Sequence, residues 1–307
     1  MGLADGLYRR IRSDGVVGGV KRAVVDGVNI YSGKAGRHIN YGQRPLDEEW
    51  DILVLLDACR YDLFTEFAPT HAVQERFESV DSVYSCASTS KEWMRKVYEE
   101  AEAETLQDIH LVSANGWEPK EVDLSKFGAV TPVWEHTDFD IGTIRPQKVT
   151  DAAVHAGRSS DCERFIVHYM QPHAPFIHCA GKYDSVNDHP GQGRSQNVWE
   201  GLKEGKYDRT EVWNDYGTNL LSVLDHVETL AENMSGRMVV SADHGNALGE
   251  WGIYGHPGYV PLPALKRVPW ATIDASDEHT YEPDDPLEPG LAESDVDEHL
   301  RALGYKM

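Results

Sequence analysis

The chain has 307 residues, of which 40% are hydrophobic, so it is long enough for one large α/β domain or two small ones. Its 51 acidic residues exceed its 29 basic ones, and the net charge of −22 is spread along the sequence. Such a surface repels nucleic acid and stays soluble when salt screens its charges. We therefore expect a halophilic protein that binds no nucleic acid.

The cysteine pattern and the hydropathy indicate a cytoplasmic protein. No apolar run approaches the ~20 residues that span a bilayer, so we expect no integral membrane segment. An arginine pair, Arg9 and Arg10, is followed by a segment without an apolar core, which argues against an export signal. None of the cysteines lies in a CxxC or CxxH pattern, so we expect reduced thiols: Cys59, Cys86, Cys162 and Cys179.

Composition divides the chain into three parts. Residues 1–48 have only a weak helical pattern, and we expect them to form an N-terminal arm that packs on the main domain. Residues 49–275 carry the periodic segments of one α/β catalytic domain. Residues 276–307 are acidic and rich in proline at first, and they end in a pattern typical of one short helix. The sequence itself indicates no oligomeric state.

The first strand of the expected domain is the continuous apolar run at residues 52–56, which is followed by a helix over 61–67. Asp57 comes directly after this run. Open α/β sheets place their ligands at the carboxyl ends of their strands. Asp57 is therefore a candidate metal ligand, although a carboxylate here could also cap the following helix.

Three consecutive hydroxyl residues, Ser88, Thr89 and Ser90, precede a helical face that contains Trp93 and Val97. A hydroxyl at the start of a helix is most often a cap. It can also be a nucleophile, because the free N–H groups there favour an oxyanion and a nearby cation lowers the pKa of the hydroxyl. We expect Ser88 to be the nucleophile, because it follows a small residue and opens the helix, with Thr89 as the alternative.

The middle of the chain alternates between predicted strands and helices. Further strands are expected at 109–113, 129–134 and 164–169, with helices at about 90–104, 150–156 and 208–233. After the strand at 164–169, Pro172 and Pro175 punctuate a loop that holds His173. His168, inside that strand, is expected to be a core histidine with a hydrogen-bond partner.

The long segment at 179–206 has no clear periodicity, and we expect a lid or a substrate loop there. A second apolar run at 238–241 leads directly into Asp243 and His244, so a carboxylate and an imidazole follow a strand end side by side. His256 follows in a loop rich in glycine and tyrosine. The segment 265–273 is expected to be an edge or late strand with a bulge at Pro269.

All of these polar residues follow a strand or begin a helix, so they could meet at one edge of one sheet. Asp57, Asp243 and His244 would then bind one divalent cation, and this ligand set suits Mn²⁺, Mg²⁺, Ca²⁺ or Zn²⁺. Ser88 or Thr89 would complete the site as the attacking hydroxyl.

Four further residues are candidates for contact with the substrate. His173 and His256 would contact the non-bridging oxygens of a phosphate or sulfate ester or protonate its leaving group. Arg60 and Lys91 flank the expected site, where they would either bind the anion or form ion pairs with nearby carboxylates.

Four segments together resemble the alkaline phosphatase superfamily, and within it the sulfatase-like hydrolases of haloarchaea: ILVLLDACRYD, SCASTSKEW, HYMQPHAPF and VVSADHGNALGEWGIYGHPG. The resemblance covers about residues 50–273. It implies a three-layer sandwich with a mostly parallel central sheet and a metal site at the strand ends. It also implies a hydrolase, or a transferase, of sulfate or phosphate esters carried by a small molecule or a glycan.

The chain also departs from parts of this family. Sulfatases convert the cysteine of a Cys-x-Pro-Ser-Arg motif to formylglycine, but the run from Cys86 to Ser90 lacks the proline and the arginine. The pattern looks closest to one-metal enzymes such as lipoteichoic acid synthases, which use one acid, a threonine and an Asp-His pair. The alternatives are a catalytically silent protein that binds anionic glycans and a cofactor-independent mutase for phosphorylated sugars.

Overall fold

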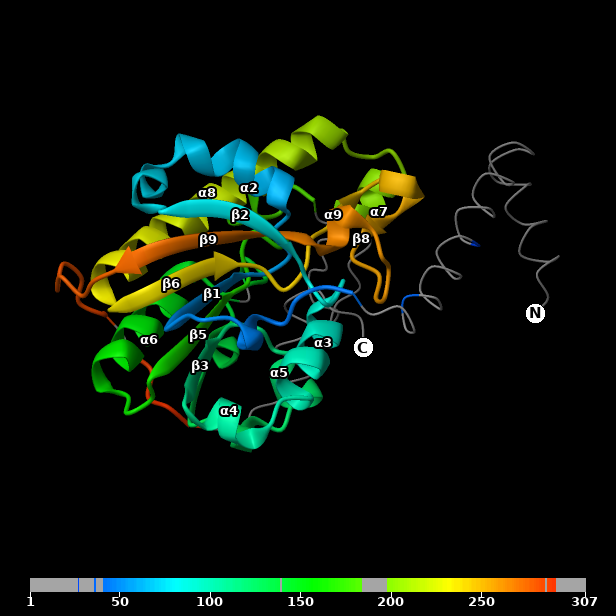
Figure 1. Ribbon diagram of the computed structural model, residues 1–307. Coiled ribbons are helices and arrows are strands. Elements are labelled where there is room, and N and C mark those ends of the chain that lie inside the picture. The colour runs from blue at the N-terminus through cyan, green and yellow to red at the C-terminus, as the bar shows by residue number, and fades with distance from the viewer. Residues whose placement is uncertain are drawn as a thin grey trace, which may run out of the picture.

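The computed structural model describes residues 41–138, 140–183, 198–284 and 286–290, together with Gly27 and Gly36 (Figure 1). Within these residues, seven strands form one sheet in the order β2-β9-β6-β1-β5-β3-β4. Neighbouring strands are parallel from β6 to β4, and β9 runs antiparallel to both β6 and β2. The strands are β1 (Ile52–Leu56), β2 (Ser79–Tyr84), β3 (Ile109–Ser113), β4 (Ala129–Pro132), β5 (Arg164–Tyr169), β6 (Gly236–Ser241) and β9 (Arg267–Ala275).

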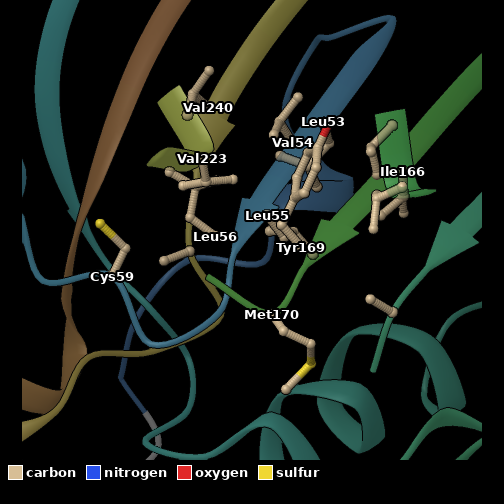
Figure 2. Packing of buried hydrophobic residues seen from close by; sticks show 14 of the residues in the cluster. Leu53, Val54, Leu55, Leu56, Cys59, Ile166, Tyr169, Met170, Val223 and Val240 are labelled. Atoms are coloured by element: carbon tan, nitrogen blue, oxygen red, sulfur yellow. The ribbon is translucent and has the colours of Figure 1, made fainter. Parts of the chain in front are cut away.

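The central strand β1 lies between β5 and β6, and none of its five residues is exposed to solvent. Helices cover the sheet on either side, so both faces of β1 need apolar side chains, which explains its unbroken apolar sequence. Figure 2 shows β1 side chains in one cluster with Ile166 of β5 and Val240 of β6.

The flanking helices complete the α/β architecture. Two of them, α2 (Tyr61–Phe67) and α6 (Pro146–Ser159), pack against the long helix α8 (Arg209–Asn233). The shorter elements are α3 (Ser90–Met94), α4 (Ala103–Gln107), α5 (Glu118–Glu121), α7 (Val198–Lys203), α9 (Pro263–Lys266) and the hairpin of β7 (Ala247–Leu248) and β8 (Tyr254–Gly255). The predicted sandwich with a mostly parallel sheet is confirmed.

Several element boundaries differ from the sequence-based expectation. The helix that begins at Ser90 continues as a π-helical turn, η4 (Arg95–Glu99), and then breaks before α4. Strand β2 was not expected, because it is half exposed and has no apolar run. The last strand, β9, is not an edge strand, since β2 covers its outer side.

Pro269 is compatible with this inner position. It pairs with Ser82 of β2, whereas the ladder between β6 and β9 covers only residues 271–275 of β9 and so does not include Pro269. The missing N–H of the proline therefore interrupts no bond of that ladder.

The expected arm at residues 1–48 lies mostly outside the described residues, and the short C-terminal helix lies wholly outside them. Half of the expected lid at 179–206 is described, and this half includes helix α7. The described part of the acidic tail contains no helix or strand, and its Asp277 forms an ion pair with Arg158 of α6. No described helix is long and apolar enough to cross a membrane. The cytoplasmic location and the adaptation to high salt stay predictions.

Candidate metal centre

Asp57 leaves the end of β1 with one carboxylate oxygen bound and the other open. Its backbone N–H donates to the Tyr169 carbonyl at 3.0 Å, which extends the pairing of β1 with β5 by one residue. Asn115, which follows β3, donates its side-chain N–H to Asp57 Oδ2 at 3.2 Å. Asp57 Oδ1 is fully buried and has no hydrogen-bond partner among the described residues.

Asp243 has the same arrangement at the end of β6. Its Oδ1 accepts the N–H groups of Ala58 at 3.0 Å and of His244 at 2.9 Å. Ala58 has a φ of 63°, so the turn after β1 aims this N–H at the neighbouring strand end. Asp243 Oδ2 is buried and without a hydrogen bond in the part of the chain that the structure describes.

The His244 ring is fixed by the backbone of the next residue. Its Nδ1 donates to the Gly245 carbonyl at 2.9 Å, so Nε2 carries the free electron pair. A side chain at Gly245 would collide with the Ala264 carbonyl, because an added Cβ would lie 2.4 Å from that oxygen. Glycine therefore permits the close approach of this turn to α9.

The open atoms of these three residues point to one place. Asp57, Asp243 and His244 offer ligand atoms that all lie within 4.8 Å of one another, and all three side chains are buried. His244 Nε2 lies 3.6 Å from Asp57 Oδ1 and 3.4 Å from Asp243 Oδ2. Ligands of a tetrahedral cation with bonds of ~2.0 Å are separated by roughly 3.3 Å, so this donor set fits a divalent cation.

The electrostatics of the centre are those of a site that lacks positive charge. Burial raises the pKa of Asp57 well above its usual range, and the carboxylates of Asp243 and Glu118 raise it further. Burial also acts to raise the pKa of Asp243, but His244, His168 and hydrogen bonds outweigh it, so that this pKa is lowered. Two buried carboxylates this close need a counter-charge to be ionised together, and a bound cation would supply it.

The three hydroxyl residues have different surroundings. Ser90 Oγ lies 3.2 Å from His244 Nε2, at the edge of the centre. Thr89 is the N-cap of α3, and its hydroxyl accepts the Glu92 N–H at 3.2 Å. Ser88 Oγ donates to the Pro257 carbonyl at 2.9 Å and accepts the Val260 N–H at 3.2 Å. Among these contacts, that of Ser90 reaches a metal ligand, whereas the hydroxyls of Ser88 and Thr89 bind the local backbone.

The side chains of His173 and His256 contact each other next to the centre. Their Nε2 atoms lie 3.1 Å apart, and the His256 ring stacks on that of His244 with ring centroids 4.6 Å apart. Burial lowers the pKa of His173 to about 4, helped by the neighbouring His244, and burial likewise lowers the pKa of His256 well below its usual range. Both rings are neutral at pH 7, and the two residues adjoin the centre as the sequence analysis expects.

Arg60 and Lys91 have partners of their own. Arg60 binds Asp62, Glu250 at 2.8 Å and the Asn246 carbonyl at 2.9 Å. Its neighbouring cavity of about 340 Å³ is also lined by exposed Trp251. Lys91 lies 3.2 Å from the centroid of the Trp117 ring and 4.0 Å from Glu121. Both cations are thus held by acidic or aromatic side chains in this structure.

The sequence analysis did not single out three residues at this site. Asn115 orients Asp57, and Glu118 forms a buried pair with His168, with 3.3 Å between Oε1 and Nδ1. Asn115 follows the predicted strand 109–113, so its position at a strand end was the available signal. Ser90 was named only as part of the hydroxyl run, because sequence alone does not show which hydroxyl faces the strand ends.

Comparisons with known proteins show which solved structures have a similar fold. Searches with protein-family models and among curated proteins found no match. A search of solved structures found the soluble domain of lipooligosaccharide phosphoethanolamine transferase A from Neisseria meningitidis, with 14% identity, a TM-score of 0.51 and coverage of 74% of this chain and 77% of that one. The C-terminal periplasmic domain of phosphoethanolamine transferase EptC from Campylobacter jejuni matches with 16% identity, a TM-score of 0.50 and coverage of 72% and 77%.

The integral membrane form of the Neisseria transferase matches with 15% identity and a TM-score of 0.52. That alignment covers 88% of this chain but only 56% of the transferase, so the chain spans about half of the longer protein. At these identities the likeness concerns the fold. The chain therefore has the fold of the alkaline phosphatase superfamily, as its four motifs predict.

Proposed function

We propose that this protein is a metal-dependent hydrolase or transferase of phosphate or sulfate esters that uses Ser90 as its nucleophile. One observation carries the proposal. In each of Asp57, Asp243 and His244, one side-chain oxygen or nitrogen forms a hydrogen bond. The other lies close to those of the two neighbouring residues and could bind a shared cation. Ser90 Oγ lies beside these atoms, 3.2 Å from His244 Nε2.

A divalent cation held by these three residues would lower the pKa of the Ser90 hydroxyl and offset the charge of the ester. Ser90 Oγ then forms a bond to phosphorus or sulfur while the bond to the leaving oxygen breaks. The Ser90 hydroxyl gives up one proton, and the leaving alcohol takes up one. Water releases the group from Ser90 in a hydrolase, and a second alcohol accepts it in a transferase.

The two histidines above the centre provide polar contacts for the ester. Both are neutral at pH 7, and His256 Nδ1 has no partner in the described part of the chain. We assign them to the non-bridging oxygens of the substrate and to proton transfer to the leaving oxygen. An anionic ester close to the rings would raise their pKa values and favour the protonated form that this transfer needs.

A panel of substrates at high salt tests the proposal. Aryl sulfate, aryl phosphate and phosphodiester substrates are offered to the full chain loaded with Mn²⁺, Mg²⁺, Ca²⁺ or Zn²⁺. Cleavage of at least one substrate, with a phosphoryl or sulfuryl group on Ser90 in the mass spectrum of quenched protein, is expected. Binding of a divalent cation without turnover of any substrate would favour a silent glycan-binding protein instead.

A further inference from the structure

A second group of metal-ligating side chains lies outside the centre. His178 and Cys179 belong to the 3₁₀ turn η7 (Ile177–Cys179), which follows the loop of His173, and Asp215 faces them from α8. The ligand atoms of these three residues lie within 4.8 Å of one another. His178 Nε2 lies 3.2 Å from Asp215 Oδ1, so an imidazole and a carboxylate oxygen already face each other.

Asp215 Oδ1 contacts His178, a member of the same group, whereas other neighbours of Asp215 bind its second oxygen. Lys182 and Tyr183 both bind the other oxygen, Asp215 Oδ2. Lys182 also forms an ion pair with Glu211 at 2.9 Å. With a neutral Cys179, the two carboxylates and Lys182 sum to one negative charge. A divalent cation together with a Cys179 thiolate would bring the sum to zero.

The donor set specifies the kind of ion. A thiolate, an imidazole and a carboxylate together suit Zn²⁺ rather than Ca²⁺ or Mg²⁺, which take oxygen ligands. Burial and the nearby Asp215 carboxylate raise the pKa of the Cys179 thiol to about 11, so the free thiol is protonated at pH 7. On binding, the S–H bond breaks as the bond from sulfur to zinc forms, and the proton passes to water.

The position of the group on α8 gives it a role. Asn219, one turn after Asp215 on the same helix face, holds the active-site loop at three points. Its Nδ2 donates to the carbonyls of Pro172 at 3.1 Å and of His173 at 3.2 Å, and its Oδ1 accepts the Ile177 N–H at 3.1 Å. A metal at Asp215 would extend this attachment to the end of the loop.

We propose that His178, Cys179 and Asp215 bind a zinc ion separate from the cation of the Asp57 centre, and that this zinc fastens the His173 loop to α8. The inference does not depend on the proposed ester chemistry, because it concerns other residues and its readout is not activity.

Cobalt provides the test, because Co²⁺ bound to a thiolate has a charge-transfer band in the near ultraviolet that carboxylate and histidine ligands do not produce. The full chain with Asp243→Asn, which weakens the first centre, is titrated with Co²⁺ and then with Zn²⁺. We expect the band to appear with one Co²⁺ per chain and to disappear as Zn²⁺ displaces it.

Two added substitutions locate the site. Cys179→Ser should abolish the band, and His178→Ala should weaken Co²⁺ binding by at least ~10-fold. Cys162→Ser, which changes another partly exposed cysteine, is the matched control and should leave the titration unchanged. A chain without the band at equimolar Co²⁺, or a band that survives Cys179→Ser, would overturn the proposal.

Discussion

Two polar clusters lie at the start of α3, and they differ in how their polar atoms are satisfied. In the first, Glu92 Oε2 accepts the Ser88 N–H at 3.2 Å and the Tyr259 N–H at 2.9 Å, and its Oε1 pairs with Lys96. In the second, Ser90 lies beside His244, and the buried oxygens Asp57 Oδ1 and Asp243 Oδ2 have no hydrogen bond from any described residue.

The contrast separates a structural role from a chemical one. The Ser88–Glu92–Lys96 cluster uses its hydrogen bonds to join α3 to the loop at residues 257–260, next to His256. The Ser90 cluster keeps two carboxylate oxygens buried without a hydrogen bond from any described residue, which costs stability unless a cation binds them. Two serines only two residues apart therefore have different tasks, and substitutions can test the distinction.

The largest effect is expected from Ser90→Ala. Because this change removes the attacking oxygen and no described backbone contact, turnover should fall by ~10³-fold or more, while the unfolding free energy stays nearly constant. Steady-state kinetics and denaturant unfolding measure the two quantities. Ser90→Ala with full turnover would show that another hydroxyl attacks.

Asp243→Asn should remove metal and activity together. The amide keeps an acceptor for the Ala58 N–H but loses the negative charge, so turnover should fall by about 10²-fold or more. Elemental analysis measures the metal content, with Asp62→Asn as a control outside the centre. Normal metal content in the Asp243 variant would contradict the assigned ligand.

Glu92→Gln should chiefly affect stability. Glu92 and Lys96 form a largely buried ion pair, and removal of one partner leaves the other charge unpaired. We expect a loss of about 3 kcal/mol in unfolding free energy, measured by urea denaturation. If the variant were as stable as the wild type but as inactive as Ser90→Ala, Glu92 would belong to the chemical cluster.

Ser88→Ala should have a smaller effect of the same kind. The change leaves the Val260 N–H and the Pro257 carbonyl without their hydroxyl partner, so stability should fall by about 1–3 kcal/mol. Turnover should stay within about tenfold of the wild type, and the loss should appear mainly in KM through the displaced His256. Complete loss of turnover at unchanged KM would restore Ser88 as the nucleophile.

The smallest effect concerns the metal-free protein. The folded pKa of Asp57 lies above the unfolded value, so protonation of Asp57 favours the fold at acidic pH, and this contribution disappears as pH rises through the folded pKa. Asp57→Asn should therefore stabilise the chelator-treated chain at pH 7 and stabilise it progressively less toward pH 4. Urea denaturation across this pH range would contradict the expectation if the difference grew on acidification.

The sequence predicts those parts of the fold whose burial is complete. Strands β1, β3 and β5 begin and end at the predicted residues. Strand β1 is an unbroken apolar run, as suits a strand covered on both faces, and β3 and β5 keep shorter apolar runs beside the buried His110 and His168. Strand β2 lies at the sheet edge with Val80 and Tyr84 exposed, so no such run marks it. The position of Asp57, Asp243 and His244 at strand ends follows from the same buried runs.

Two features of the site cannot be predicted from the sequence: which of the neighbouring hydroxyls faces His244, and which distant residues bind Arg60. The order Ser88, Thr89, Ser90 does not reveal which hydroxyl faces His244, since that is set by contacts of Ser88 with a loop 169 residues later in the chain. Arg60 is similar, because Glu250, its distant partner, comes from the segment after His244.

The connectivity of the central strand has a consequence during synthesis on the ribosome. Strand β1 emerges early, but its two neighbours come from residues 164–169 and 236–241. A nascent chain therefore carries an unpaired apolar strand until residues 164–169 and 236–241 have been translated, and such long-range pairing is slow to form. Asp57, Asp243 and His244 cannot meet before residue 244 has left the exit tunnel, so the candidate metal centre forms only after six of the seven strands of the central sheet have been synthesised.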